Sequence, residues 1–289
     1  MTNPEEIKAV PLRHPVRNAA AVFLILCAAA FIKDASQREA FGWATYRDSI
    51  FDPRVFKAAL VTLELTAATM LIAIVVGIVL AVMRRSPNPV FKAISWLFIW
   101  VFRGTPVYVQ LVFWGLLSTI YPKIYIGIPF IHVGDLYAGM HITMSQTQSL
   151  FWLAVVGLSC NEAAYMAEIV RAGLLSVETG QEEAAQSLGM SWWTTMRRIV
   201  IPQAMRIIIP PTGNEVISML KTTSLVTAVP LATDLYARTR DISDETYNPI
   251  PLLLVASTWY LVFTTVLMIG QYFLEKRFSR GHRTMIAGG

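Results

Sequence analysis

Charged residues are scarce in this sequence of 289 residues: they make up 15% of the chain, whereas hydrophobic residues make up 55%. Soluble domains contain roughly 25% charged residues, so the chain has too few to cover a surface that faces water on all sides. Cysteine is almost absent, and both examples, Cys27 and Cys160, lie in apolar stretches without metal-ligand spacing. The composition excludes an ordinary soluble domain and indicates a protein embedded in a membrane.

Several enzyme motifs are also missing. No G-x4-G-K-[ST] phosphate loop occurs, so we expect that the chain does not hydrolyse ATP itself. No HExxH pair occurs, and the four histidines all lie outside the apolar segments. We therefore predict no catalytic residue, no metal site and no cofactor in this chain. An intramembrane enzyme is a remote alternative.

Long apolar segments are what the sequence does contain. A helix needs ~20 apolar residues to cross ~30 Å of hydrocarbon, and backbone groups in lipid must be satisfied within the segment, which favours helices. The prediction is an all-α membrane protein, a polytopic bundle of about six transmembrane helices. These cover roughly residues 18–32, 57–83, 90–120, 149–171, 210–236 and 250–274.

Basic residues lie just outside these segments. Arg84 and Arg85 follow the second, Arg197 and Arg198 lie in the long loop after the fourth, and further basic residues follow the last. Lysine and arginine concentrate in cytoplasmic loops, so we expect both termini to be cytoplasmic in a bacterial plasma (inner) membrane. These clusters account for the net charge of +5, so membrane lipid is expected as a partner and nucleic acid is not.

The first apolar segment has two interpretations. Its short run from Ala19 to Ile32 follows basic residues and resembles a signal peptide. However, Glu5 and Glu6 are unusual in the basic leader of such a peptide, and no clear cleavage site follows the run. We expect a retained transmembrane span.

The polar stretch from Val177 to Ala204 is predicted to fold as two short helices joined by a sharp turn. Thr179, with Glu182 three residues later, matches a capping box that begins the first helix. Gly189 can supply the left-handed residue that ends it. Ser191 suits the N-cap of a second helix that runs to Ile201, before Pro202.

Small side chains at Ala184 and Ala185 would let another protein surface approach this loop closely, and Glu183 offers that surface a charge. An amphipathic connector that lies on the bilayer would fit the same residues. The spacing of the loop separates the two interpretations.

The loop resembles the signature E-A-A-x3-G-x9-I-x-L-P of the membrane subunits of ATP-binding-cassette importers. Ile201 stands where that family usually has leucine, which is an apolar exchange. The matching residues are Glu183, Ala184, Ala185, Gly189, Ile199 and Pro202.

Further elements resemble the polar amino-acid branch of this family, the histidine/glutamine-type permeases. They lie in the family's order between about residues 57 and 277, whereas residues 1–54 fall outside the resemblance. These elements are Arg103-Gly104-Thr105-Pro106 with Gln110, then Tyr165, Glu168, Ile169 and Arg171, then Gly180-Gln181, Pro202-Gln203-Ala204 and Lys221-Thr222-Thr223-Ser224-Leu225.

The resemblance implies three regions. Residues 1–54 would hold a cytoplasmic segment, an extra first span and an outer loop. Residues 55–280 would form the importer domain, with five core spans and a coupling loop at about 177–204, and 281–289 a cytoplasmic tail. The implied coupling residues are Glu182, Glu183, Ala184, Ala185, Gly189 and Pro202.

The same resemblance implies four kinds of partner. They are a dimer of cytoplasmic ATPase subunits, which would bind ATP and Mg, a second permease subunit that is identical or paralogous, an extracytoplasmic amino-acid-binding protein and membrane lipid.

Ionisable residues inside a span cost at least ~2.5–3.5 kcal/mol on insertion scales, so each invites a functional interpretation. Arg103 lies ~20 Å along its helix, and the Gly104-Thr105-Pro106 that follows should break that helix. Discontinuous helices often bind solutes. We place seven residues on a candidate substrate path: Glu64, Arg103, Thr105, Asn161, Glu162, Tyr165 and Ser224.

Other membrane charges have structural or intersubunit interpretations. Glu168 and Arg171 are three residues apart, which suits an ion pair on one helix. Glu215 and Lys221 are six apart and therefore not on one face. Acids outnumber bases inside the spans, which weakly favours a basic solute. A self-powered secondary transporter is the alternative, although it would not need the docking loop.

Overall fold

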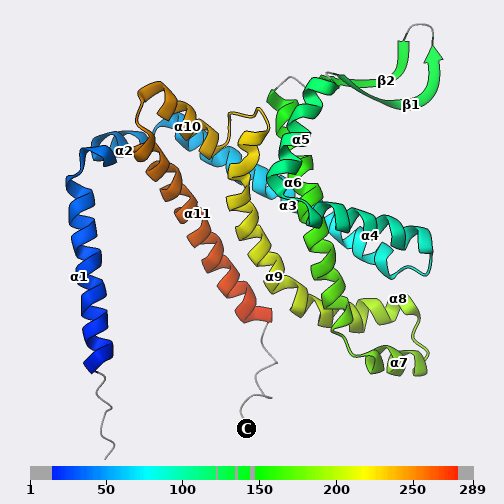
Figure 1. The fold of residues 1–289 in the computed structure, drawn as a ribbon. Coiled ribbons are helices and arrows are strands. Elements are labelled where there is room, and N and C mark those ends of the chain that lie inside the picture. The colour runs from blue at the N-terminus through cyan, green and yellow to red at the C-terminus, as the bar shows by residue number, and fades with distance from the viewer. Residues whose placement is uncertain (1–14, 122, 134–135, 144–146, 279–289) are drawn as a thin grey trace, which may run out of the picture.

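The computed structural model of the chain describes residues 15–121, 123–133, 136–143 and 147–278 (Figure 1). The expected cytoplasmic tail at 281–289 and the segment before Pro15 lie outside these residues. The first half of the described chain contains the helices α1 (Pro15–Gln37), α2 (Trp43–Ser49), α3 (Pro53–Arg85), α4 (Pro89–Gly104) and α5 (Val107–Ile120). The second half contains α6 (Thr147–Leu175), α7 (Thr179–Ser187), α8 (Trp192–Thr195), α9 (Ile201–Thr222), α10 (Leu235–Thr246) and α11 (Pro249–Phe278).

Two of the bundle helices, α3 and α4, begin with the same capping arrangement. An Asx residue precedes a proline, whose missing N–H costs nothing at the first helical position. Asp52 accepts a hydrogen bond from the N–H of Arg54 at 2.8 Å at the start of α3. Asn88 accepts one from the N–H of Val90 at 2.9 Å at the start of α4. The neighbouring Arg54 side chain also lowers the pKa of Asp52 below its usual value.

Membrane-spanning helices account for most of the bundle. Four described helices, α1, α3, α6 and α11, are long and apolar enough to cross a bilayer, and the number is five if α4 and α5, which are bent by 104°, are counted as one span. The expected fifth span, 210–236, is not confirmed. In its place α9 ends at Thr222, and a 3-10 segment over Thr223–Ala228 follows it. The prediction of a helical membrane bundle is confirmed, whereas the count of six is not.

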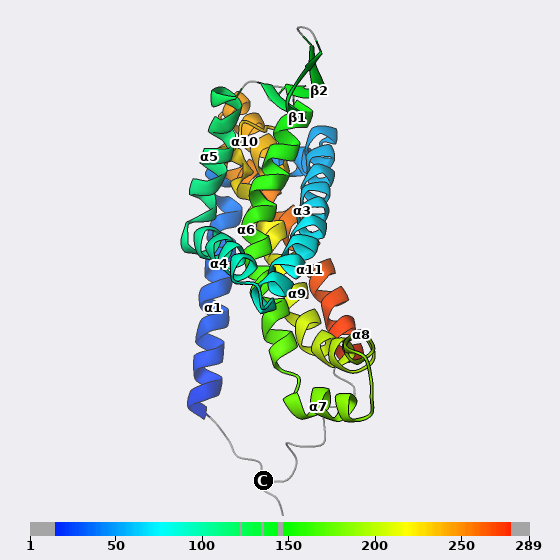
Figure 2. The same cartoon turned by 90° about the vertical axis from the view of Figure 1, so that its right-hand side faces the viewer.

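Helix α3 packs along α6 at the centre of the bundle (Figures 1 and 2). The two backbones approach closely at Gly77, where an added Cβ would lie 2.6 Å from the Cβ of Met166 and 3.1 Å from the carbonyl oxygen of Ala163. The largest buried cluster forms around this contact and includes Leu65 and Leu158. The lack of a side chain at Gly77 therefore sets the spacing of the two central helices.

Two features lie outside this packed centre. Strands β1 (Lys123–Val133) and β2 (Leu136–Thr143) form an antiparallel hairpin between α5 and α6 that projects from the end of the bundle (Figure 1). No strand was predicted in this loop. Helix α1 stands apart from the bundle, and its hydrogen bond from Trp43 Nε1 to the carbonyl of Ala35, at 3.0 Å, lies at the end nearer α2.

We predict that Gly77→Ala lowers the thermal stability of the purified chain, because its Cβ would overlap Met166. Overpacking of a core costs about 1–3 kcal/mol, which exceeds the ~1 kcal/mol that alanine adds to a helix. Gly270 on α11 is the control, because nothing lies within 4 Å of its added Cβ. Gly270→Ala should leave the melting temperature unchanged or raise it, and equal effects of the two variants would contradict the tight α3–α6 contact.

Candidate coupling loop and translocation path

The predicted coupling loop lies at the end of the bundle opposite α10 and the hairpin (Figures 1 and 2). Its first helix, α7, begins one residue earlier than predicted, because Glu178 is the N-cap and Thr179 is already helical. No side chain caps this end, and the first bond of the helix runs from the N–H of Gln181 to the carbonyl of Glu178 at 3.0 Å. The predicted capping box with Thr179 as N-cap is therefore wrong.

The turn between the two helices follows the prediction. Gly189 has a left-handed φ of 72°, and the N–H of Met190 donates to the carbonyl of Ala185 at 3.1 Å, which is the bond that closes such a helix end. Ser191 then accepts a hydrogen bond from the N–H of Thr194 at 3.3 Å as the N-cap of α8. The sharp reversal of the loop is thus set by local residues.

We expected the second helix to end before Pro202, but the structure shows that it continues. A π-helical turn over Met196–Val200 joins α8 to α9, and the N–H of Ile201 donates to the carbonyl of Met196. A proline has no N–H and its ring clashes with the carbonyl four residues earlier. The wider π turn just before Pro202 fits this constraint, so one helical path runs from the coupling loop into the bundle.

The loop presents an exposed face at its first helix. Glu183 and Ala184 are exposed, Leu188 is 81% exposed, and Ala185 is buried. Glu182 lies 3.9 Å from Arg85 at the end of α3. A negatively charged, small-residue and apolar patch is therefore open at the end of the molecule, while the buried side of α7 faces its own chain.

The helices on either side of the loop, α6 and α9, pack closely against each other. At Gly173 on α6 an added Cβ would overlap the side chain of Ile208 on α9 and would lie 3.2 Å from the carbonyl oxygen of Ala204. These residues lie close to the two ends of the loop. The two helices that flank the loop therefore pack against each other as one unit.

The predicted helix break at Gly104-Thr105-Pro106 is confirmed, since α4 ends at Gly104 and α5 begins at Val107. The break frees carbonyl groups that lipid cannot satisfy. Gln110 Nε2 donates to the carbonyl of Phe102 at 3.0 Å and to that of Thr105 at 3.0 Å. Asn161 Nδ2 on α6 donates to the carbonyl of Phe102 at 2.8 Å and to Gln110 Oε1 at 3.2 Å. Two side-chain amides thus hold the bend.

Four residues of the candidate path meet at this break. The Arg103 guanidinium lies over the ring of Tyr165 at 5.1 Å from its centroid, which is a cation–π distance. Thr105 Oγ1 accepts from Gln110 Nε2 at 2.7 Å, and Asn161 lies on the same network. Gln110 also belongs to the site. The sequence indicated it only as part of the motif that begins at Arg103, and no separate signal pointed to a role for its side chain.

Glu162 is buried, and its Oε1 has no hydrogen-bond partner within the described part of the chain. Its electrostatic neighbour is Glu215 on α9, which we expected only as a structural residue. Glu64, which we expected beside Glu162, is exposed on α3. The acid that interacts electrostatically with Glu162 is thus Glu215, on a different helix.

The remaining membrane charges differ in their surroundings. Arg171 Nη2 lies 2.6 Å from Glu168 Oε2, which confirms the expected ion pair on α6. Lys221 is exposed near the end of α9, and its carbonyl accepts from Ser224 Oγ at 2.7 Å.

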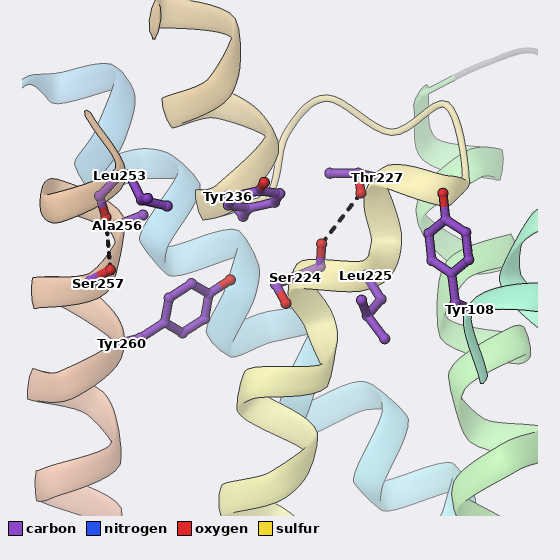
Figure 3. A pocket seen from close by; sticks show the side chains of 9 residues that line it. All are labelled: Tyr108, Ser224, Leu225, Thr227, Tyr236, Leu253, Ala256, Ser257 and Tyr260. Atoms are coloured by element: carbon purple, nitrogen blue, oxygen red, sulfur yellow. Dashed lines mark hydrogen bonds between the residues drawn. The ribbon is translucent and has the colours of Figure 1, made fainter. Parts of the chain in front are cut away.

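Ser224 lines a separate pocket toward the hairpin end of the bundle, with a volume of about 440 Å³ (Figure 3). Three aromatic side chains, Tyr108, Tyr236 and Tyr260, surround it together with hydroxyl groups. The pocket therefore offers hydrogen bonds and ring faces to a polar solute. Within the described ranges, no group of His, Cys, Asp and Glu is arranged to hold a metal ion.

Residues 73–280 match the family model described as the inner-membrane component of binding-protein-dependent transport systems. The chain belongs to this family. As a permease subunit of an ATP-binding-cassette importer, it forms a translocation pathway and is not an enzyme. The matched range contains the coupling loop, the helix break, the buried Glu162 and the half-buried Glu215.

Individual relatives and structures agree with this assignment. The permease is 54% identical over 285 residues to the arginine transport system permease protein of Corynebacterium glutamicum, covering 98% of this chain and 87% of the relative. It is 33% identical over 214 residues to the histidine/lysine/arginine/ornithine transport system permease protein of Salmonella typhimurium, covering 74% and 85%.

Among solved structures, an amino acid ABC transporter crystallised with histidines superimposes on this permease with a TM-score of 0.63 at 32% identity, covering 78% of this chain and 94% of that one.

We predict that Gln110→Leu and Asn161→Leu each lower the melting temperature of the purified permease, because the first removes the donor to the carbonyl of Thr105 and the second removes the donor to Gln110 Oε1. A buried unsatisfied group costs about 1–3 kcal/mol. The double variant should cost less than the sum, since both amides serve the same network. The exposed amide Gln203 supplies the control Gln203→Leu, which should have little effect. Additive losses from the two amides would show that they act independently.

Proposed function

We propose that this permease carries a basic amino acid inward across the bacterial inner membrane, driven by a separate cytoplasmic ATPase dimer that binds ATP and Mg. The observation that carries the proposal is the exposed face of α7 at Glu183 and Ala184, at one end of a continuous helical path into the bundle. An extracytoplasmic amino-acid-binding protein would deliver the solute at the other end, and both termini would be cytoplasmic.

Two observations support a basic solute. The relatives at 54% and 33% identity are named for arginine and for histidine, lysine, arginine and ornithine. Glu162 and Glu215 also place two acids together in the bundle, and an unpaired buried charge is too costly to be retained without a role. A cation that enters between these acids would supply the missing opposite charge.

The proposed path combines the acids with the helix break. Glu162, with Glu64, would receive the ammonium group or the basic side chain of the solute. Arg103 would attract the solute carboxylate, and its stacking on Tyr165 keeps the guanidinium near the break. Thr105, Asn161 and Ser224 would add polar contacts.

The proposed assembly contains two permease subunits, identical or paralogous, over the ATPase dimer. The exposed Lys221 would contact the second permease subunit. Glu215 and the Glu168–Arg171 pair would support the path or the subunit interface. Residues 1–54 would add a leading span to five core spans, with α7 to α8 as the coupling element.

We predict that Glu183→Arg abolishes solute-stimulated ATP hydrolysis by the reconstituted complex, because it reverses the charge on the proposed docking face. Glu39→Arg makes the same charge change in the exposed 3-10 turn Glu39–Phe41, outside the matched range 73–280, and serves as the control. Uptake and stimulated hydrolysis should survive in the control. Full coupling in Glu183→Arg, or uptake that continues without the ATPase, would refute an ATPase-driven mechanism through this loop.

We also predict that Glu162→Gln weakens competition by arginine and lysine for uptake at least about tenfold, because a neutral amide cannot balance a cation. Competition by glutamine should change less. Glu39→Gln, in the exposed 3-10 turn Glu39–Phe41, is the matched control. An unaltered uptake spectrum in normally produced Glu162→Gln protein would remove Glu162 from the solute path.

A further inference from the structure

A large apolar groove lies in the half of the bundle that carries the coupling loop. Its volume is about 1080 Å³, and α3, α6, α9 and α11 all contribute to its walls. Ile78, Met166 and Ile208 are among the side chains that line it. This size exceeds that of ordinary small-molecule sites, which measure about 300–1,000 Å³. The groove is thus too large and too apolar for a free amino acid.

A second, smaller pocket of about 460 Å³ continues this groove toward the end of the bundle. The two cavities share Met205, Ile209 and Phe278 as a common wall. The smaller one adds the arginines Arg206 and Arg277. The combined cavity therefore has a long apolar part and a basic part next to each other.

The charges that line the combined cavity all have one sign. Arg85, Arg206 and Arg277 are the charged lining residues, and no acid is among them. Arg85 lies 3.9 Å from Glu182, whereas Arg206 and Arg277 have no carboxylate within ion-pair distance in the described part of the chain. Two arginines at the edge of an apolar groove are therefore available to an anionic group.

Two tryptophans indicate where the groove lies relative to the membrane surface. Trp192 and Trp193 line it and are 69% and 64% exposed, and tryptophan concentrates at the boundary between hydrocarbon and headgroups. The basic part of the cavity and these rings lie at the same end of the bundle, where Arg85 ends α3 and Arg277 lies in the last turn of α11.

We infer that this cavity binds an anionic phospholipid of the leaflet next to the coupling loop, with acyl chains in the groove and the phosphate at Arg206 and Arg277. Basic pockets between transmembrane helices on the cytoplasmic side bind such headgroups. Because the walls include Trp192, which lies in the coupling loop, and α9, which continues from that loop into the bundle, the bound lipid would brace the loop against the bundle. The inference is independent of which solute the permease carries.

The test uses the full-length permease reconstituted in nanodiscs that contain phosphatidylcholine and phosphatidylglycerol in equal amounts. Native mass spectrometry after release into detergent measures how much of each lipid stays bound. The wild-type chain should retain phosphatidylglycerol preferentially. The double variant Arg206→Gln with Arg277→Gln should reduce that retention at least about tenfold. The control Arg197→Gln with Arg198→Gln removes two exposed arginines that line neither cavity and should retain the lipid.

A second pair of variants tests the groove without changing charge. Ile78→Trp fills the groove from α3 and should reduce retention of both lipids, whereas Leu71→Trp, which is on α3 outside the lining, should not. Retention of phosphatidylglycerol that is unchanged in both groove and arginine variants overturns the inference. It is also overturned if Ile78→Trp lowers only the dimeric fraction of the permease, because a second copy would then occupy the groove.

Discussion

The amides of Gln110 and Asn161 bond the carbonyl groups that the Gly104-Thr105-Pro106 break leaves free, and much of the permease depends on this arrangement. A membrane offers no water to unsatisfied backbone groups, so a bend of 104° between α4 and α5 needs partners inside the protein. Because Asn161 lies on α6, the bend is fixed to the central helix. The same bend places Arg103 over the ring of Tyr165, and Asn161 directly precedes the buried Glu162 in the chain.

Tight packing carries this geometry through the bundle to the coupling loop. Gly77 lets α3 approach α6, and Gly173 lets α9 approach α6 near the loop. Helices that interlock at such contacts move as units, since close-packed interiors deform little. The π turn before Pro202 extends α9 into the loop without a flexible joint. A partner that docked on α7 would therefore act on the helices that carry Glu162 and Glu215.

Different parts of the membrane domain offer different chemistry. The helix break and the acids Glu162 and Glu215 suit a charged polar solute. The tyrosine-lined pocket in Figure 3 offers hydroxyl groups nearer the hairpin. The groove beside the coupling loop is apolar and has arginines at its edge. Lipid and solute can therefore use separate surfaces of one small bundle. This separation follows from where the few charged residues of the chain are placed.

The sequence by itself determined what depends on short stretches of chain: the membrane class from long apolar runs, the turn at Gly189 and the cap at Ser191, the helix break before Val107, and the family from the spacing around Glu183. Local rules failed at Thr179, which is helical and not an N-cap, and at Pro202, which continues a helical path. Length and apolarity did not establish the expected span over 210–236. The pairing of Glu162 with Glu215, the role of Gln110 and the basic groove join residues from different helices. Only the tertiary structure could decide them, because such contacts depend on which helix faces pack and not on sequence spacing.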